Sequence, residues 1–296
     1  MIRYNVNTCD HPAEGSELMV HFTKFCPHHC PFCIDKTNPG VNYKKKPDVD
    51  AIIKTIDTYK NYVKNITISG GEPFVFIDEL EKLIDWIKEN TSLKILIITS
   101  LPENCFTDRE RVLKILNKCD SIQISLQYYN EEIADKIRGV RSIGSKNAFY
   151  IDILEYCGVD KVVGSINILK PYFNSKEDII AEVVLFNHVI GFKNIKICEM
   201  FDADEYYIDI PKMLGIKLPA PFASGCKTEY KGAESWSYLG MQFKGKLYIK
   251  RSCFYRTNYQ KASISDFIKI CTRWIFAKKY FFGVIHENGE IAPYWM

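Results

Sequence analysis

The feature that most constrains the fold is a regular alternation of short β-rich runs with helical patterns between about residues 18 and 200. Continuous apolar runs such as Ile95-Leu96-Ile97-Ile98 are typical of strands that are buried on both faces, as in a parallel sheet. The β-rich runs are rich in Ile, Val and Leu, and we expect strands at residues 18–23, 65–69, 93–99, 121–127, 162–169 and 194–200.

Helical patterns lie between these strands. Two apolar stripes have the i, i+3, i+4, i+7 spacing of an amphipathic helix: Val49, Ile52, Ile53, Ile56 and Val63, and then Ile77, Leu80, Leu83, Ile84 and Ile87. Pro47-Asp48 provides a start for the first helix, and later helices are expected at 109–117, 146–157 and 176–190. Six strands alternating with five helices predict an α/β fold with right-handed βα crossovers. A doubly wound sheet and an open barrel both fit this pattern.

The composition and pattern of the sequence change after about Phe201. The last third is aromatic-rich and interrupted by glycines, and we expect hairpins at 243–248 and at 286–291, the latter with Asn288-Gly289 as its turn. We therefore expect a first domain over residues 1–200. A C-terminal extension over residues 201–296 would serve as a substrate-binding module or lid.

Charge and hydropathy narrow the class of protein. The 39 Lys and Arg residues nearly balance the 36 Asp and Glu residues, and the net charge of +3 favours neither nucleic acid nor a membrane surface as a partner. No apolar run approaches the roughly 18 residues of a membrane span. The N-terminus lacks the basic start and apolar stretch of a signal peptide. We therefore expect a cytoplasmic protein.

Eleven cysteines without a secretion signal are expected to be buried residues, metal ligands or catalysts. Cys119, Cys157 and Cys198 lie in or beside apolar segments, and we expect them in the core. Cys26, Cys30 and Cys33 are different, because their C-x3-C-x2-C spacing falls in the loop after the first expected strand.

Three bare thiolates this close together would repel one another, so we expect a cation or a cluster to hold the triplet. Zinc is one solution, with His28 or His29 as the fourth ligand. A four-iron cubane is another, since three cysteines would leave one iron open to a substrate or cofactor. Otherwise, both histidines are expected to be exposed loop residues.

The triplet, with Phe32 before its last cysteine, resembles the cluster-binding loop of the radical S-adenosylmethionine (SAM) superfamily. That family places the loop after the first strand of a partial (β/α)6 barrel of the TIM type. The motif Ser69-Gly70-Gly71-Glu72-Pro73 follows the second expected strand and resembles the segment that binds the amino group of SAM. The glycines let backbone approach a ligand closely, Glu72 can accept hydrogen bonds from an ammonium, and Pro73 stiffens the exit.

A third segment, which begins with Ser125-Leu126-Gln127 at the end of the fourth expected strand, also resembles the family, and the resemblance as a whole reaches about residue 200. It implies that Ser125, at the end of the fourth strand, contacts the ribose and that Arg138 pairs with the SAM carboxylate. Alternatively, Arg138 is a helix C-terminal cation capped by Gly139. By position alone, Thr99, Ser100 and Asn167 also point to the cofactor. The family often has Asp where Gln127 stands, and Asn-Gly where Ser100-Leu101 stands.

The resemblance implies two cofactors: SAM, and a [4Fe-4S] cluster on Cys26, Cys30 and Cys33. Reductive cleavage of SAM would give a 5′-deoxyadenosyl radical, which abstracts hydrogen from a small-molecule, nucleotide or peptide substrate. A one-electron donor such as flavodoxin or ferredoxin would be a partner. The catalytic residues are not identified by any motif. Three cysteines of the last third, Cys226, Cys253 and Cys271, are candidates for a second cluster or for hydrogen-atom transfer.

Two other functions fit the same residues. One is an activase that installs a glycyl radical on a partner protein, which predicts a protein-binding surface in the last third. The other is a non-catalytic α/β binding protein stabilised by zinc or a cluster. From the 25 residues before Cys26 we expect no peptide-recognition or cobalamin domain ahead of the triplet, which disfavours leader-dependent peptide modification and cobalamin-dependent methylation. Prokaryotic viperin-like nucleotide dehydratases share the size and the cysteine spacing, but no subfamily motif selects them.

Overall fold

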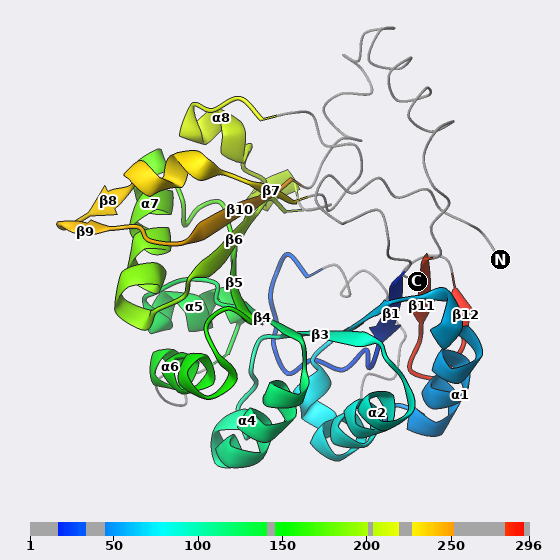
Figure 1. Ribbon diagram of the computed structural model, residues 1–296. Coiled ribbons are helices and arrows are strands. Elements are labelled where there is room, and N and C mark those ends of the chain that lie inside the picture. The colour runs from blue at the N-terminus through cyan, green and yellow to red at the C-terminus, as the bar shows by residue number, and fades with distance from the viewer. Residues whose placement is uncertain are drawn as a thin grey trace, which may run out of the picture.

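The computed structural model describes residues 17–33, 45–140, 146–200, 204–218, 227–251 and 282–292. Figure 1 shows a curved sheet with helices packed on its convex side. Its strands are β1 (Glu17–His21), β2 (Asn65–Ser69), β3 (Lys94–Thr99), β4 (Ser121–Ser125), β5 (Val162–Asn167), β6 (Asn194–Cys198), β7 (Lys227–Glu229), β10 (Lys246–Lys250), β11 (Phe282–Ile285) and β12 (Ile291–Ala292). A separate short hairpin consists of β8 (Ser237–Tyr238) and β9 (Met241–Gln242).

The helices follow the strands in the expected alternation. They are α1 (Val49–Tyr59), α2 (Ile77–Asn90), α3 (Asn104–Thr107), α4 (Arg109–Lys118), α5 (Glu131–Arg138), α6 (Lys146–Cys157), α7 (Lys176–Leu185) and α8 (Ile210–Leu214). Short 3₁₀ turns cover Lys60–Tyr62, Pro73–Phe76, Asp204–Tyr206 and Lys231–Ser235, and a π turn covers Phe186–Ile190. Within the described ranges, none of these helices has the length and apolar character that crossing a membrane requires.

The strand order of the large sheet is β12-β11-β1-β2-β3-β4-β5-β6-β10-β7. Strands β1 to β6 lie in chain order and pair in parallel, which is the order of a barrel and not of a doubly wound sheet. Strands β11 and β10 add parallel neighbours at the two ends, and β12 and β7 are antiparallel edges. The barrel is open in the described residues, since β12 and β7 do not pair with each other. The expected partial (β/α)6 barrel of the TIM type is confirmed.

Local sequence signals account for the ends of the helices. The carboxylate of Asp48 accepts a hydrogen bond from the backbone N–H of Ala51 at 3.0 Å, so the expected start of the first helix is confirmed. Ser175 and Asp178 form a reciprocal capping box at the start of α7. Gly139 ends α5 with a φ of +66°, a left-handed conformation that glycine adopts without strain.

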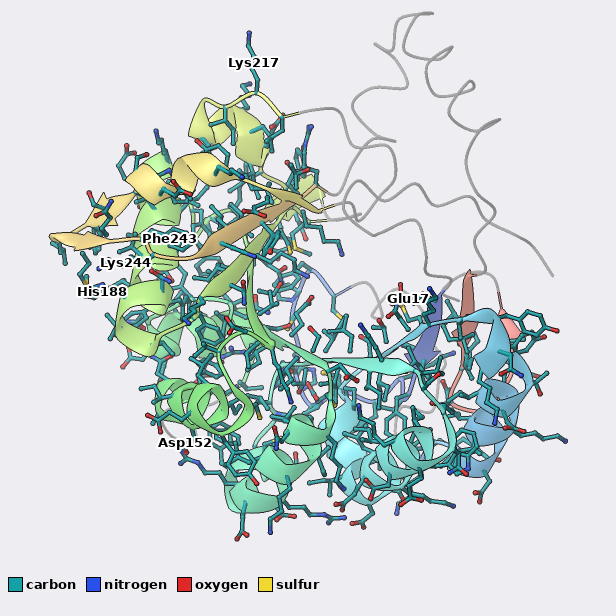
Figure 2. All side chains as sticks on the ribbon, in the orientation of Figure 1. Glu17, Asp152, His188, Lys217, Phe243 and Lys244 are labelled. Carbon is teal, nitrogen blue, oxygen red and sulfur yellow. The ribbon has the colours of Figure 1, made fainter. Side chains whose placement is uncertain are left out.

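All six expected strands are present, with ends that differ by at most two residues. The expected helix at 146–157 coincides with α6, and that at 176–190 is α7 followed by the π turn. The buried amide of Asn187 explains the turn. It donates hydrogen bonds to the carbonyls of Phe192 and Lys244 and accepts one from the N–H of Lys244, at 2.7–2.9 Å. Figure 2 shows Lys244 and Phe243 beside this turn.

The expected hairpin at 243–248 is wrong. Residues 246–250 form β10, which pairs in parallel with β6 and antiparallel with β7. Gly245 is not a turn residue but a point of close approach, because a Cβ there would lie 2.2 Å from the carbonyl oxygen of Lys193. The N–H of Lys246 donates to the same carbonyl at 2.8 Å, which directs the chain into the sheet beside β6.

The second expected hairpin is confirmed. Strands β11 and β12 pair antiparallel around Asn288-Gly289, and Gly289 has a φ of +81°. We call residues 282–292 the rim hairpin. Strands β10 and β7 thus extend the large sheet beyond β6, and β11 and β12 extend it beyond β1 (Figure 1). The division into a domain of residues 1–200 and an extension of residues 201–296 stays a prediction.

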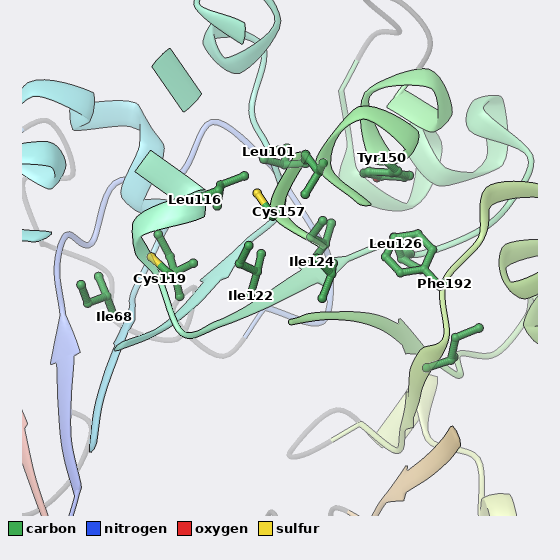
Figure 3. Packing of buried hydrophobic residues seen from close by; sticks show 14 of the residues in the cluster. Ile68, Leu101, Leu116, Cys119, Ile122, Ile124, Leu126, Tyr150, Cys157 and Phe192 are labelled. Carbon is green, nitrogen blue, oxygen red and sulfur yellow. The ribbon is translucent and has the colours of Figure 1, made fainter. Parts of the chain in front are cut away.

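The core lies between the sheet and its helices. Figure 3 shows Ile122 and Ile124 of β4 facing side chains from the covering helices. The expectation that Cys119, Cys157 and Cys198 are core residues is confirmed, since each is less than 8% exposed. They therefore act as small apolar side chains.

Helix α6 offers a matched test of this packing. Ile153 is fully buried, whereas Ile151 on the same helix is 37% exposed. We expect Ile153→Ala to lower the free energy of unfolding by about 2–5 kcal/mol through lost burial and a residual cavity. Ile151→Ala should change it by less than about 1 kcal/mol. Urea unfolding measures both variants, and equal losses would contradict this orientation of α6.

Candidate functional site

The candidate site lies at the carboxyl edge of the sheet, where the parallel strands β1 to β6 all end. The chain leaves β1 at His21 and continues into the segment that carries Cys26, Cys30 and Cys33, which we call the cysteine loop (residues 22–33). Figure 1 shows this loop passing from β1 across the open side of the sheet towards β5 and β6. The cysteines thus stand at the same edge as the ends of the other strands.

The cysteine loop packs backbone to backbone against the turn that follows β2, the Gly-Gly-Glu-Pro turn (residues 69–73). The N–H of Gly71 donates to the carbonyl of Thr23 at 2.6 Å, and that of Glu72 donates to the carbonyl of Phe25 at 2.9 Å. A Cβ on Gly71 would lie 2.3 Å from the carbonyl oxygen of Phe25, and one on Gly70 would lie 2.6 Å from that of Thr23. The glycines are therefore required for contact with the cysteine loop.

The carboxylate of Glu72 is the central hydrogen-bond acceptor of the turn. It is buried and accepts four hydrogen bonds: from the hydroxyl of Thr99, the N–H of Phe74, and both the N–H and the hydroxyl of Ser100, at 2.5–3.2 Å. Burial raises the pKa of the Glu72 carboxyl, and the four donors oppose this rise. Thr99 and Ser100 therefore lie where the sequence placed them, but their hydroxyl groups hold Glu72.

The same network reaches the cysteine loop through His28. The Nδ1 atom of His28 lies 3.0 Å from the hydroxyl of Ser100. The expectation of an exposed His28 is wrong: its side chain is 8% exposed, whereas His29 is exposed as expected. Burial, together with the cations Lys146 and Arg138 nearby, lowers the pKa of His28 to about 3, so the imidazole is neutral at physiological pH.

The far end of the cysteine loop is anchored by Phe32. This ring packs with Ile137 of α5 and with Leu169, which follows β5, and it meets the ring of Tyr206 edge to face at 6.1 Å between centroids. The loop is thus held both near β2 and near β5.

The middle of the loop contacts the end of α5. The N–H of His29 donates to the carbonyl of Arg138 at 2.6 Å, and a Cβ on Gly139 would lie 2.9 Å from the Cβ of His29. Gly139 therefore serves both to end α5 and to admit the cysteine loop. Its capping role, expected as the alternative, is confirmed in its geometry.

Arg138 itself is 1% exposed and lies under the end of β4. Its Nη2 atom donates to the carbonyls of Ser125 and Leu126 and to the hydroxyl of Tyr150, at 2.6–3.3 Å, and Nη1 donates to Asp135. The Nε atom is buried and has no hydrogen-bond partner in the described structure. Arg138 thus positions the segment that carries Ser125 and retains one unused donor.

Two residues at this edge adopt the left-handed conformation that favours glycine. Leu101 has a φ of +53° and Gln127 a φ of +71°. Leu101 stands where the radical SAM family often has the Gly of Asn-Gly, so the departure noted in the sequence falls on a strained position. Gln127 accepts a hydrogen bond from the amide of Asn167 at 3.3 Å, which joins the ends of β4 and β5.

A buried acid on α7 holds the segment after Gln127. Glu182 is 4% exposed and accepts a hydrogen bond from the N–H of Tyr129 at 2.6 Å. Burial raises the pKa of its carboxyl from 4.5 to about 7. The loop from β4 to α5 is therefore fixed from outside the sheet by a group that titrates near neutral pH.

The side chains of Cys26, Cys30 and Cys33 are half-buried and form no disulfide. Burial raises the pKa of the Cys26 thiol, and the negative charge of Glu72 and the neighbouring Cys30 and Cys33 raise it further. Thiolates in this loop therefore require a positive partner. A separate group at this edge, His21, His286 and Glu287, brings three metal-binding atoms within 4.8 Å of one another.

The structure adds residues that the sequence analysis did not single out. Lys146, at the start of α6, is buried, and burial together with Arg138 lowers the pKa of its ammonium to about 8. Lys146 carries no spacing signal, and its burial, like that of His28, depends on contacts between distant elements. The candidates Cys226, Cys253 and Cys271 lie outside the described residues.

Comparison with known proteins supports the resemblance seen in the sequence. Residues 20–149 match the family model of the radical SAM superfamily, which confirms the resemblance over that range. No curated protein matches the sequence.

Two solved structures share the fold. Streptococcus suis SuiB, solved bound to S-adenosylmethionine, is 18% identical with a TM-score of 0.59, over 95% of this chain and 60% of its own. The native structure of anSMEcpe with bound AdoMet is 12% identical with a TM-score of 0.51, over 94% of this chain and 74% of its own. The chain thus spans 60% of the length of SuiB. At these identities the comparison establishes the fold.

The buried carboxyl of Glu182 on α7 predicts that the free energy of unfolding depends on pH. Unfolded, Glu182 ionises near 4.5, and folded it ionises near 7, so between these values the unfolded state binds fewer protons. The free energy of unfolding contributed by this group therefore falls as pH rises from 4.5 to 7, by up to about 3 kcal/mol. Glu182→Gln should remove this dependence.

Urea unfolding at several pH values between 4.5 and 8 measures the effect. The control is Glu177→Gln, an exposed position on the same helix. Parallel curves for the wild type and Glu182→Gln would show that the carboxyl ionises normally.

Proposed function

We propose that this chain, whose residues 20–149 match the family model of the radical SAM superfamily, is an enzyme that cleaves SAM reductively at a [4Fe-4S] cluster to abstract hydrogen from a polar substrate. The observation that carries the proposal is the contact between the cysteine loop and the Gly-Gly-Glu-Pro turn. Their backbone hydrogen bonds of 2.6 and 2.9 Å join the two motifs that the family uses for the cluster and for SAM.

The donor set fits a four-iron cluster better than a single zinc ion. A structural zinc ion takes four protein ligands, whereas the cysteine loop supplies three thiolates. His28, one of the two histidines expected as a fourth zinc ligand, directs Nδ1 to Ser100 instead. Three iron corners of a cubane match three thiolates and leave the fourth corner open. We propose Cys26, Cys30 and Cys33 as the cluster ligands.

A cluster held by Cys26, Cys30 and Cys33 would supply the one electron that reductive cleavage of SAM to methionine and a 5′-deoxyadenosyl radical requires. The residues of this chain position the bound cofactors and shield them. The Glu72 network fixes the turn beside the cysteine loop, and His28 and Phe32 fix the loop itself. Neutral His28 adds no charge next to the cysteines, so thiolate charge is balanced by the bound group.

The SAM contacts divide between backbone and side chains. Because the Glu72 carboxylate already accepts four hydrogen bonds, we assign recognition of the SAM amino group to the backbone at Gly70, Gly71 and Pro73. Ser125 and Asn167 are half-buried at the ends of β4 and β5 and suit hydrogen bonding to the nucleoside. Thr99 and Ser100 act as positioning residues for Glu72.

The concave face of the sheet favours a polar substrate. Strand register places Thr67 of β2, Gln123 of β4 and Lys196 of β6 on this face, opposite the apolar residues that pack on the helices. The ammonium of Lys196 donates to the side-chain carbonyl of Gln123 at 2.5 Å. We propose a small molecule, nucleotide or peptide with hydrogen-bonding groups as the substrate. A one-electron donor such as flavodoxin or ferredoxin would reduce the cluster.

Loss of one cluster ligand tests this function. Anaerobic reconstitution should give a brown protein with about four irons per chain, which forms 5′-deoxyadenosine from SAM and dithionite. We expect Cys30→Ala to lower 5′-deoxyadenosine formation at least about 100-fold, because the cluster loses one of three ligands. Chromatography of the quenched reaction and iron analysis measure both properties.

The control is Cys157→Ala, which replaces a buried cysteine of α6 and should retain activity. SAM cleavage by Cys30→Ala would refute the ligand assignment. A colourless wild-type protein that holds zinc with full stability would refute the proposed enzymatic function.

Arg138 tests the SAM site separately. Its buried Nε is the donor we assign to the SAM carboxylate. We expect Arg138→Met to weaken SAM binding at least about tenfold with unchanged iron content, since a charge-assisted hydrogen bond contributes roughly 1.5–3 kcal/mol. The variant should also unfold more easily, because the carbonyls of Ser125 and Leu126 lose their donor.

Equilibrium dialysis with SAM measures the affinity. Arg109→Met, at a 40% exposed side chain of α4, is the control. An unchanged SAM affinity in Arg138→Met would leave Arg138 a purely structural role beneath β4.

A further inference from the structure

A second group of metal-binding side chains lies at the carboxyl edge, apart from the cysteine loop. His21 is the last residue of β1, and His286 and Glu287 follow β11 in the rim hairpin. Strands β1 and β11 are parallel and pair Val20 with Ile285, so the next residues, His21 and His286, lie side by side. One ligand atom from each of the three side chains lies within 4.8 Å of the other two.

The side chains of His21, His286 and Glu287 lie close to one another. The two imidazole rings meet edge to face with centroids 6.0 Å apart. The Nδ1 atom of His21 lies 3.9 Å from Oε2 of Glu287. Two imidazoles and one carboxylate are a common donor set for zinc and other divalent transition metals.

Burial makes this arrangement costly without a further partner. His21 and His286 are 1% and 7% exposed. The Nε2 atom of His286 and the Oε2 atom of Glu287 are buried and accept or donate no hydrogen bond in the described structure. A buried polar atom without a partner destabilises the fold by roughly 1–3 kcal/mol. A cation between them would satisfy both atoms at once.

The rim hairpin that carries two of the three side chains is firmly held. The N–H of Asp48 donates to the carbonyl of Glu287 at 2.7 Å, and the hydroxyl of Thr55 donates to that of Gly289 at 2.6 Å. Gly289 lies directly on α1, since a Cβ there would be 2.6 Å from Ala51. Helix α1 therefore fixes the hairpin against β1, so the donors are pre-positioned.

We propose that His21, His286 and Glu287 form a binding site for one divalent transition metal ion, with zinc as the preferred ion. Bonds of about 2.0–2.2 Å to nitrogen and oxygen place tetrahedral ligand atoms roughly 3.3–3.5 Å apart, so the observed cluster needs only side-chain adjustment. Three protein ligands leave a fourth position for water or a substrate oxygen.

The place of the site suggests why a fourth position matters. The ring of His21 lies beside Gly70, with its Cδ2 atom 3.1 Å from where a Cβ of that glycine would stand. The metal would therefore border the Gly-Gly-Glu-Pro turn on the concave face. It would hold an oxygen of the substrate near the cofactor site and tie the rim hairpin to β1.

Zinc binding to the full-length chain tests the proposal. A full-length variant with Cys26, Cys30 and Cys33 all changed to Ala removes the thiolates of the cysteine loop. We expect it to bind about one zinc per chain in equilibrium dialysis followed by elemental analysis. On this background, His286→Ala and Glu287→Gln should each weaken zinc binding at least about tenfold.

Two matched controls separate the site from general effects. His188→Ala replaces an exposed histidine of the π turn, which Figure 2 shows on the opposite side of the molecule from Glu17 of β1. Glu290→Gln replaces an exposed glutamate of the rim hairpin itself. Both should bind zinc as tightly as the background, and circular dichroism should show that every variant is folded.

Zinc affinity that is unchanged in both His286→Ala and Glu287→Gln would overturn the proposal, as would a folded background variant that binds no zinc. Should His286→Ala fail to fold, the more exposed Glu287→Gln decides alone. Zinc binding does not depend on the proposed enzyme activity. Failure to form 5′-deoxyadenosine with intact zinc binding would refute only the proposed function, and the reverse result only the metal site.

Discussion

The arrangement of the site depends on one contact, in which the backbone of the cysteine loop lies directly on the Gly-Gly-Glu-Pro turn. Gly70 and Gly71 leave no Cβ between the two segments, and the N–H groups of Gly71 and Glu72 donate across the contact. Parallel pairing of β1 with β2 makes this possible, because it ends both strands at the same level. A side chain at Gly71 would push the loop away and separate the cysteines from the turn.

The contact is stabilised by a buried charge. Removing the Glu72 carboxylate from water is costly, and four hydrogen-bond donors of Thr99, Ser100 and Phe74 offset the cost. The network continues through Ser100 to His28, so the ends of β2 and β3 and the cysteine loop are joined in one polar system. Such a network orders the site more than it stabilises the fold, since each member needs all of its partners. The strained backbone of Leu101 is held in the same place, where its N–H donates to the Thr99 hydroxyl at 2.9 Å.

The sequence predicts the elements well because their signals are local. Apolar runs and helical stripes locate six strands to within two residues, and Asp48 and Asn288-Gly289 mark a helix start and a turn. Local sequence patterns mispredict residues whose environment is set by contact with a distant segment of the chain. Gly245 was interpreted as a turn but admits the carbonyl of Lys193. His28 was expected in solvent but is buried, with Nδ1 3.0 Å from the hydroxyl of Ser100, which follows β3. Motifs point to Glu72 and Arg138 and strand position points to Thr99, yet only the structure reveals that Glu72 binds Thr99 and that Arg138 binds Asp135 and the backbone of Ser125 and Leu126.

The return of the chain from β10 to β11 explains why the site draws on both ends of the sequence. β11 pairs with β1 in parallel, so its end delivers His286 to the level at which β1 delivers His21. Periodicity cannot reveal that neighbourhood, because 264 residues separate the two histidines and neither stands in a spaced motif. An antiparallel β11 would have sent the same residue to the opposite edge. The direction of one strand therefore decides whether the carboxyl edge holds one group of metal-binding side chains or two.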